Sequence, residues 1–253
     1  MKYIILLYFI FFSFSYSQPK DKNIKVDYKQ YCNTDFPVIL HAVLMVNDNV
    51  GIYQDKLSMT ERWTEKPTDI ELSVEKLRTT YEPYLKIDRN KKEMFFFDQI
   101  GKNIFLVKDN YTDLKWDITK ETKEVAGYIC TKATTNFRGR QWIAWFAPEI
   151  PVALGPWKLH GLPGLILEAS DSTKTYTIIA EKVEYSKSDI FAKDFITLMN
   201  VKSKKPVPIQ KFMQDGQEAQ DNVDKVLMAD KNFTLEVKKE PRNGEELIYE
   251  WEQ

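Results

Sequence analysis

Short strand-like segments, separated by turn signals at short intervals, dominate this sequence and limit the folds that it can adopt. Residues 24–31 alternate in polarity, so Ile24, Val26 and Tyr28 would share one face of a strand. Turn sequences such as NDNVG, DRNKK and IGKN divide the segments that follow. Further segments rich in Val, Ile, Tyr, Thr and Phe occupy residues 36–55, 84–110, 114–150 and 165–186. The pattern predicts a mainly β fold, either a curved antiparallel sheet or a half-open β-barrel.

Residues 208–232 have helical rather than strand periodicity, with Pro208 near the start. The apolar positions at helical spacing are Phe212, Met213, Ala219, Val223, Val226 and Leu227. We expect one helix from this carboxyl-terminal region to pack on the sheet, although Gly216 weakens it. Residues 69–81 could add a short helix within a polar loop. Because no repeat, low-complexity tract or linker divides the chain, residues 18–253 are expected to form a single β-rich domain.

The first 17 residues have the layout of a secretory signal peptide. Lys2 precedes an apolar run, and small and polar residues then place the cleavage after Ser17. A membrane anchor is the alternative, but the run is shorter than the about 20 apolar residues that span a bilayer. We therefore expect an exported chain, periplasmic or secreted, with no membrane span left after cleavage. The net charge of −1 argues against nucleic acid as the main partner.

The chain has two cysteines, Cys32 and Cys130. In an exported protein a small, even number of cysteines permits one disulfide. Closing a loop of roughly 100 residues would stabilise the fold by about 4–5 kcal/mol in the chain-entropy model. Two buried, inert thiols are the alternative, and the sequence alone does not decide between them.

Three of the nine glycines fall in the stretch GPWKLHGLPGLILEASD, which begins at Gly155. In Leu162-Pro163-Gly164-Leu165, proline and glycine occupy the two central places that a type II turn requires. Gly161 would let the backbone approach a neighbouring segment closely. These features predict a rigid, turn-rich rim above the apolar strand that begins at Leu165. Either a corner of the fold or the rim of a binding site would account for them.

Tryptophans and arginines cluster just before this stretch. Trp142 and Trp145 differ by three positions, so on one strand they face opposite sides of the sheet. With Trp157 they could line a groove for a lipid, sugar or peptide, or they could be core residues. Arg138 and Arg140 flank Gly139 and could hold a carboxylate or phosphate, but a structural ion pair, for instance with Glu149 or Glu168, is the favoured interpretation.

Sequence signatures of catalysis, metal binding and phosphate binding are absent. The chain contains no G-x-S-x-G, H-E-x-x-H, C-x-x-C or phosphate-loop motif, and its only histidines are His41 and His160. His41 lies in an apolar strand, which favours a structural role. His160 could act as a base beside Cys130 or a carboxylate such as Asp171. We therefore expect no metal and no cofactor, and we keep a hydrolase only as the alternative function.

The stretch from residue 116 to residue 171, with GLPGLILE at its centre, resembles the signature of the GLPGLI family of exported bacterial proteins, typical of the Bacteroidota. The resemblance extends to an early strand pair and implies a carboxyl-terminal strand. It implies an envelope location but no activity, so no catalytic residue can be carried over. The positions that define the family motif here are Gly155, Pro156, Gly161, Leu162, Pro163 and Gly164.

The favoured function is therefore a non-catalytic binding or interaction module of the cell envelope. Its partner would be an apolar or peptide ligand or another envelope protein. The near-neutral charge, the aromatic cluster and the missing catalytic signatures support this hypothesis. The residues expected to form the groove and its rim are Trp142, Trp145, Trp157, Arg140, His160 and Pro163. A hydrolase that uses Cys130 or a carboxylate with His160 and a purely structural envelope protein are the alternatives.

Overall fold

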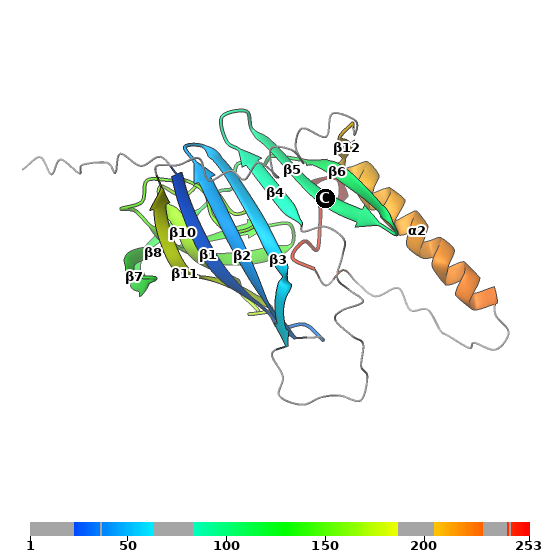
Figure 1. Ribbon diagram of the computed structural model, residues 1–253, viewed down its shortest axis with the longest axis horizontal. Helices are drawn as coiled ribbons and strands as arrows, with labels where there is room; N and C mark the ends of the chain where they lie inside the picture. The colour runs from blue at the N-terminus through cyan, green and yellow to red at the C-terminus, as the bar shows by residue number, and fades with distance from the viewer. Residues whose placement is uncertain (1–22, 36, 63–82, 187–204, 230–241, 243) are drawn as a thin grey trace, which may run out of the picture.

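The fold is built on one large curved sheet of twelve strands (Figure 1). The computed structural model describes residues 23–35, 37–62, 83–186, 205–229, 242 and 244–253, and of residues 57–62 and 226–229 only the backbone. The first half of the sheet contains β1 (Asn23–Cys32), β2 (Val38–Asn47), β3 (Val50–Arg62), β4 (Tyr84–Asp88), β5 (Glu93–Ile100) and β6 (Asn103–Asp109). The second half contains β7 (Asp117–Val125), β8 (Tyr128–Phe137), β9 (Arg140–Ala147), β10 (Leu165–Asp171) and β11 (Tyr176–Ser186). The short β12 (Val207–Pro208) follows in the chain and pairs with β6 at the edge of the first half.

Two meanders meet at the first strand. The order is β12-β6-β5-β4-β3-β2-β1-β11-β10-β9-β8-β7, and every pair is antiparallel except β12 with β6. The chain therefore runs outward from β1 to β6, crosses to the far edge at β7, and returns so that β11 pairs with the other side of β1. Tight turns at the predicted NDNVG, DRNKK and IGKN sequences join the first strands, as the alternation pattern indicated.

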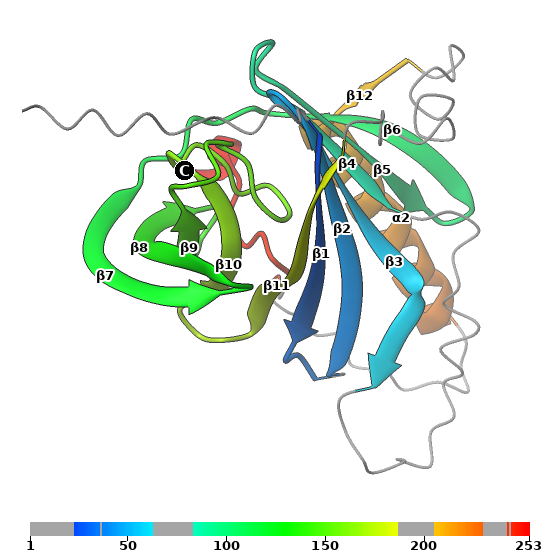
Figure 2. The ribbon, with the colours of Figure 1, turned by 60° about the vertical axis from the view of Figure 1, so that its left-hand side comes forward.

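The sheet curls strongly and leaves two edges, β7 and β12, so it is not a closed barrel (Figure 2). Register irregularities occur between β1 and β11, β2 and β3, β9 and β10, and β7 and β8. Such bulges bend a strand and increase its local twist. The predicted curved antiparallel sheet is confirmed.

The long helix α2 (Ile209–Ala229) covers the β5–β6 end of the sheet (Figure 1). Phe212 is buried and packs edge-on against Phe96 and Phe105, with ring centroids 6.3 and 5.7 Å away. Burying a phenylalanine of this kind stabilises a fold by about 2 kcal/mol. The predicted helix packed on the sheet is confirmed. The possible helix at 69–81 and the signal peptide at 1–17 lie outside the described residues.

The glycine-rich stretch fills the loop between β9 and β10, but its glycines exchange the roles that the sequence suggested. Gly164 does not have the positive φ of the expected type II turn; a Cβ there would lie 2.3 Å from the carbonyl oxygen of Ala147. Gly161 has φ +96°, and its nearest neighbour to such a Cβ, Trp116 Nε1, is 3.8 Å away. Gly164 is thus required for close packing and Gly161 for its backbone conformation. At Gly164, the close contact between this loop and β9 determines the backbone conformation, and the turn propensity of the Pro-Gly pair does not.

The carboxyl-terminal segment, residues 244–253, runs within the curve of the sheet (Figure 2). The resemblance implied a strand here, but the described residues of this segment form only a 3-10 helix, η2 (Glu250–Glu252). Tyr249 is buried against α2 and β6 in the same apolar cluster as Val107 and Ile209. The segment is therefore part of the core, although it adds no strand to the sheet.

Candidate functional site

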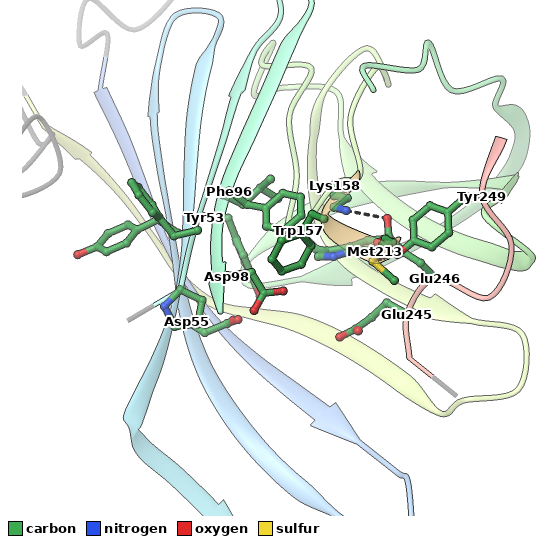
Figure 3. Close-up of a pocket in the computed structure, with 15 residues that line it drawn as sticks. Tyr53, Asp55, Phe96, Asp98, Trp157, Lys158, Met213, Glu245, Glu246 and Tyr249 are labelled. Atoms are coloured by element: carbon green, nitrogen blue, oxygen red, sulfur yellow. Dashed lines mark hydrogen bonds and ion pairs between the residues drawn. The ribbon is translucent and has the colours of Figure 1, made fainter. Parts of the chain in front are cut away.

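A pocket of about 320 Å³ opens where the sheet, α2, the β9–β10 loop and the carboxyl-terminal segment meet (Figure 3). Aromatic and acidic side chains dominate its wall. Its lining residues are Tyr53, Asp55, Pro83, Tyr84, Leu85, Phe96, Phe97, Asp98, Trp157, Lys158, Phe212, Met213, Glu245, Glu246 and Tyr249.

Strand alternation brings the sheet residues of the wall to one face. Tyr53 and Asp55 are two positions apart on β3, and Phe96 and Asp98 are two positions apart on β5, so each pair points the same way. Each strand therefore directs an aromatic ring and a carboxylate toward the pocket (Figure 3), and β5 also contributes Phe97 to its wall.

The β9–β10 loop supplies Trp157, whose backbone has the unusual left-handed value φ +51°. Its ring packs against Trp142 and Phe137, with centroids 5.2 and 5.7 Å away. A non-glycine residue in this conformation is strained and persists only where surrounding packing holds it. The two core rings are that packing, and they turn Trp157 so that it also lines the pocket.

A buried charge cluster holds the carboxyl-terminal segment against the sheet. The guanidinium of Arg138, with 1% of its side chain exposed, contacts Asp109 at 2.6 Å, Glu250 at 2.9 Å and Glu246. Lys158 lies 2.6 Å from Asp109 and 2.7 Å from Glu246. Burial alone would raise the pKa of Asp109, but the charges and hydrogen bonds of Lys158 and Arg138 outweigh it and lower that pKa. Arg138 and Lys158 therefore have a structural role, and their ion pairs hold the back wall of the pocket in place.

Two further carboxylates of the pocket wall, those of Asp55 and Glu245, differ from the members of this cluster. Within the described part of the chain, neither of them forms an ion pair with an arginine or a lysine. Oδ1 of Asp55 is buried and has no hydrogen-bond partner, whereas Oε1 of Glu245 accepts one from Gln30 Nε2 at 3.3 Å. Burial raises the pKa of Asp55 to about 7, and the charge of Glu245 adds to the effect. Burial also raises the pKa of Glu245, and the charge of Glu246 adds to this effect, whereas hydrogen bonds and the charge of Lys158 oppose it in part. Figure 3 shows both carboxylates directed into the pocket from opposite walls.

Of the residues expected to form the groove, the structure brings Trp157 to this pocket and not the others. Trp142 is fully buried beneath it, so no ligand can reach that ring in this structure. Trp145 lies on the opposite face, as the spacing indicated, with Lys123 Nζ 4.5 Å from its ring centroid. Pro163 is exposed in the β9–β10 loop.

Arg140 has the structural role that the sequence favoured, but with other partners. It lies 2.9 Å from Asp171 and donates to the carbonyl oxygen of Gly244 at 3.0 and 2.8 Å. Glu168, one of the expected partners, pairs instead with Lys123 at 2.6 Å. Arg140 therefore fixes the start of the carboxyl-terminal segment, a contact 104 residues away in sequence.

His160 is buried, with Nδ1 2.8 Å from the carbonyl oxygen of Lys158 and its ring 4.6 Å from that of Tyr111. Burial lowers its pKa and favours the neutral ring. Cys130 Sγ donates instead to the carbonyl oxygen of Tyr128 at 3.6 Å, and burial raises the pKa of this thiol to about 11. The geometry therefore gives no support to a Cys130–His160 nucleophile and base.

The candidate disulfide is absent, because Cys32 and Cys130 are both free and buried. Cys32 ends β1 and Cys130 lies in β8, and β11, β10 and β9 separate these strands. At about 4.8 Å between neighbouring strands, the two cysteines lie roughly 19 Å apart along the sheet. A disulfide needs Cα atoms within about 7 Å of each other. The alternative of two buried thiols is the correct one.

Sequence reasoning missed the acidic members of the site. Asp55 had one visible signal, because an acid follows Tyr53 on the buried face of a strand where an apolar residue is usual. Glu245 gave no signal, since it lies in a polar loop whose position depends on contacts made far away in sequence. The described residues contain no group of three or more His, Cys, Asp or Glu that could hold a metal ion.

A family model described as "Protein of unknown function (Porph_ging)" matches residues 138–168, from the β8–β9 turn to β10. No curated protein matches the sequence. Among solved structures, PNGF-II resembles the chain in two crystal forms, each with 17% identity, a TM-score of 0.56 and 78% of this chain covered. The chain spans about a third of that protein, 34% and 33% of its length in the two forms. The likeness indicates a shared fold in that part of PNGF-II.

Two more distant structures also align. An uncharacterized conserved protein from Thermus thermophilus has 8% identity and a TM-score of 0.39, with 75% of this chain and 91% of that chain covered. A putative outer membrane lipoprotein-sorting protein domain from Vibrio parahaemolyticus has 6% identity and a TM-score of 0.31, with 70% and 90% covered. These scores are too low to support an argument. Within the described part of the chain, no helix has the length and apolar character needed to cross a membrane.

Proposed function

We propose that this chain is a non-catalytic binding module of the cell envelope, and that its ligand occupies the pocket beside Trp157. The family match between residues 138 and 168 includes the GLPGLI motif, and it is consistent with membership of the GLPGLI family. The amino-terminal pattern of residues 1–17 supports export. The ligand class that fits best is a small apolar molecule or a peptide side chain.

One observation carries this proposal: a pocket of about 320 Å³ whose wall is aromatic and whose back is held by buried ion pairs. Ligand pockets are commonly apolar hollows of about 300–1,000 Å³ with a few polar groups that orient the ligand. Trp157, Tyr53 and Phe96 come from three separate segments and line the same space. Holding rings in this arrangement in advance lowers the entropy cost of binding.

A hydrolase remains the second candidate function, but only one that uses a carboxylate and not Cys130. Asp55, with a pKa near 7, has the protonation behaviour that a general acid or base needs. His160, the other member of that hypothesis, does not line the pocket. A catalytic role would therefore have to use Asp55 and Glu245 without a histidine.

The test is binding of a neutral apolar fluorophore, N-phenyl-1-naphthylamine, to the mature protein. We expect its emission to rise on binding and to fall when a competing ligand displaces it from the pocket. Trp157→Phe keeps an aromatic ring but changes the pocket wall, so it should alter affinity at least several-fold. Trp145→Phe is the matched control, because Trp145 lies on the sheet outside the pocket. No binding, or equal effects of the two substitutions in folded proteins, would contradict the proposal.

A further inference from the structure

We infer that the pocket selects a ligand that carries a cationic amine on an apolar stem, such as a lysine side chain, and holds the amine between Asp55 and Glu245. This inference rests on the proposed binding function and names its ligand class. Three features of the pocket carry it: carboxylates that lack an ion pair, aromatic rings beside them, and a protein lysine already bound in the same way.

The first feature is an excess of negative charge. The wall contains four carboxylates, those of Asp55, Asp98, Glu245 and Glu246, and one cation, Lys158. Lys158 is engaged by Glu246 and by Asp109, which lies outside the pocket wall. Among the described residues no cation forms an ion pair with Asp55 or Glu245, and Oδ1 of Asp55 lies buried without a hydrogen-bond donor. A buried carboxylate oxygen without a partner is costly, so an incoming donor with positive charge is favoured.

The second feature is the aromatic wall next to these carboxylates. The faces of aromatic rings attract cations within about 6 Å, and the rings also cover the apolar stem of an amine. Tyr53 precedes Asp55 by two positions on the same face of β3, and Phe96 and Trp157 line the same pocket (Figure 3). An amine between the two carboxylates would therefore have ring surface along its stem.

The third feature is Lys158, which shows that this wall already accommodates one ammonium group. Its Nζ lies 4.8 Å from the ring centroid of Phe96 and 5.7 Å from that of Trp157, and it pairs with Asp109 and Glu246. The wall beside Asp55 and Glu245 repeats this combination of rings and carboxylates without a lysine. A free anion would be repelled by the carboxylates here, and a neutral ligand would leave Asp55 without an ionic partner.

Without a ligand, the pocket reduces its negative charge by holding a proton. Because the pKa of Asp55 is about 7, this carboxyl group is protonated for much of the time at neutral pH. An ammonium ligand would displace that proton into solvent, so up to one proton leaves for each amine bound. Binding must then tighten as the pH rises toward 7, because fewer molecules hold a proton that the ligand has to displace.

The experiment compares three six-carbon probes that differ only at the head: hexylammonium, 1-hexanol and hexanoate. Binding to the mature protein is followed by the NMR shifts of the tryptophan indole N–H signals at pH 7.5. We expect hexylammonium to bind at least tenfold more tightly than hexanol and hexanoate to bind least. The hexylammonium affinity should rise at least tenfold between pH 5 and pH 8, and the hexanol affinity should stay constant.

Substitutions then assign the effect. Asp55→Asn and Glu245→Gln should each reduce the preference for hexylammonium over hexanol at least fivefold without weakening hexanol. Asp113→Asn, which removes a carboxylate exposed outside the pocket, is the matched control and should change neither affinity. Equal binding of all three probes by the wild type would overturn the amine inference and leave the pocket as a binding site. Failure of all three to bind would overturn the proposed function as well.

Discussion

The carboxylates of Asp55 and Glu245 should lower the free energy of unfolding at high pH, and Asp55→Asn should restore the lost stability. The ordinary pKa of this carboxyl group is 3.8, and in the folded protein it is raised to about 7. Between these values the unfolded chain has released the proton while the folded chain still holds it. The folded state therefore binds more protons, and stability falls as the pH rises from about 4 to 7.

The structure sets the size of this effect. The difference between a pKa of 3.8 and one of about 7 corresponds to roughly 4 kcal/mol once the pH exceeds both values. Asp55 is partly exposed to the pocket, so solvent screening lowers this figure. We expect Asp55→Asn to stabilise the protein by about 2–3 kcal/mol more at pH 8 than at pH 4.5. Asn has a similar size and no charge, so the substitution removes the titration and leaves the shape of the wall.

The assay is guanidinium unfolding of both proteins at a series of pH values, followed by tryptophan fluorescence. Glu245→Gln is an independent check, because losing its charge should lower the pKa of Asp55 and shift the pH window downward. Asp113→Asn should leave the pH profile nearly unchanged, since that carboxylate is exposed. Parallel profiles of wild type and Asp55→Asn from pH 4.5 to 8 would refute the raised pKa and the buried, unpaired state behind it.

Four further predictions concern the fold around the pocket. Gly164→Ala should destabilise the protein by at least about 2 kcal/mol, because a Cβ 2.3 Å from a carbonyl oxygen must displace the loop. Gly216→Ala in α2 should instead stabilise it by about 0.5–1 kcal/mol, which denaturant titration of both variants would show. Arg138→Met should cost about 3–5 kcal/mol by leaving buried carboxylates without a partner, and its melting temperature should fall accordingly. Burial raises the pKa of Cys32 to about 12 and that of Cys130 to about 11, so both thiols should react with an aromatic disulfide reagent only after unfolding. Rapid reaction of either thiol in the folded protein would contradict the last prediction.

Local pattern was sufficient to predict the longer strands and the helix α2 of this fold, but not β12 or the 3-10 helix η2. Alternation located the strands, turn residues located the hairpins, and helical spacing located α2 around Phe212. Each of these signals depends on residues only a few positions apart. The curved antiparallel form followed from the number of short strands, although the meeting of β1 with β11 did not.

The site could not be predicted in the same way, because its parts are distant in sequence. Arg138 reaches Glu246 across 108 residues, and Gln30 reaches Glu245 across 215. Aromatic composition pointed to a groove, but only Trp157 of the three candidate tryptophans lines the pocket. Turn chemistry misassigned Gly161 and Gly164, since a sequence does not show that Ala147 will press against the loop.

The carboxyl-terminal segment within the curve of the sheet also fixes when the pocket can exist. Glu245, Glu246 and Tyr249 form one of its walls, more than 80 residues after the β9–β10 loop that carries Trp157. Synthesis proceeds from the amino terminus, so all twelve strands and α2 are made before the residues of this wall. A nascent chain therefore has no complete site to fill. A ligand can bind only after residues 244–253 have packed within the curve of the sheet, so an occupied pocket reports that this contact between distant parts of the chain has formed.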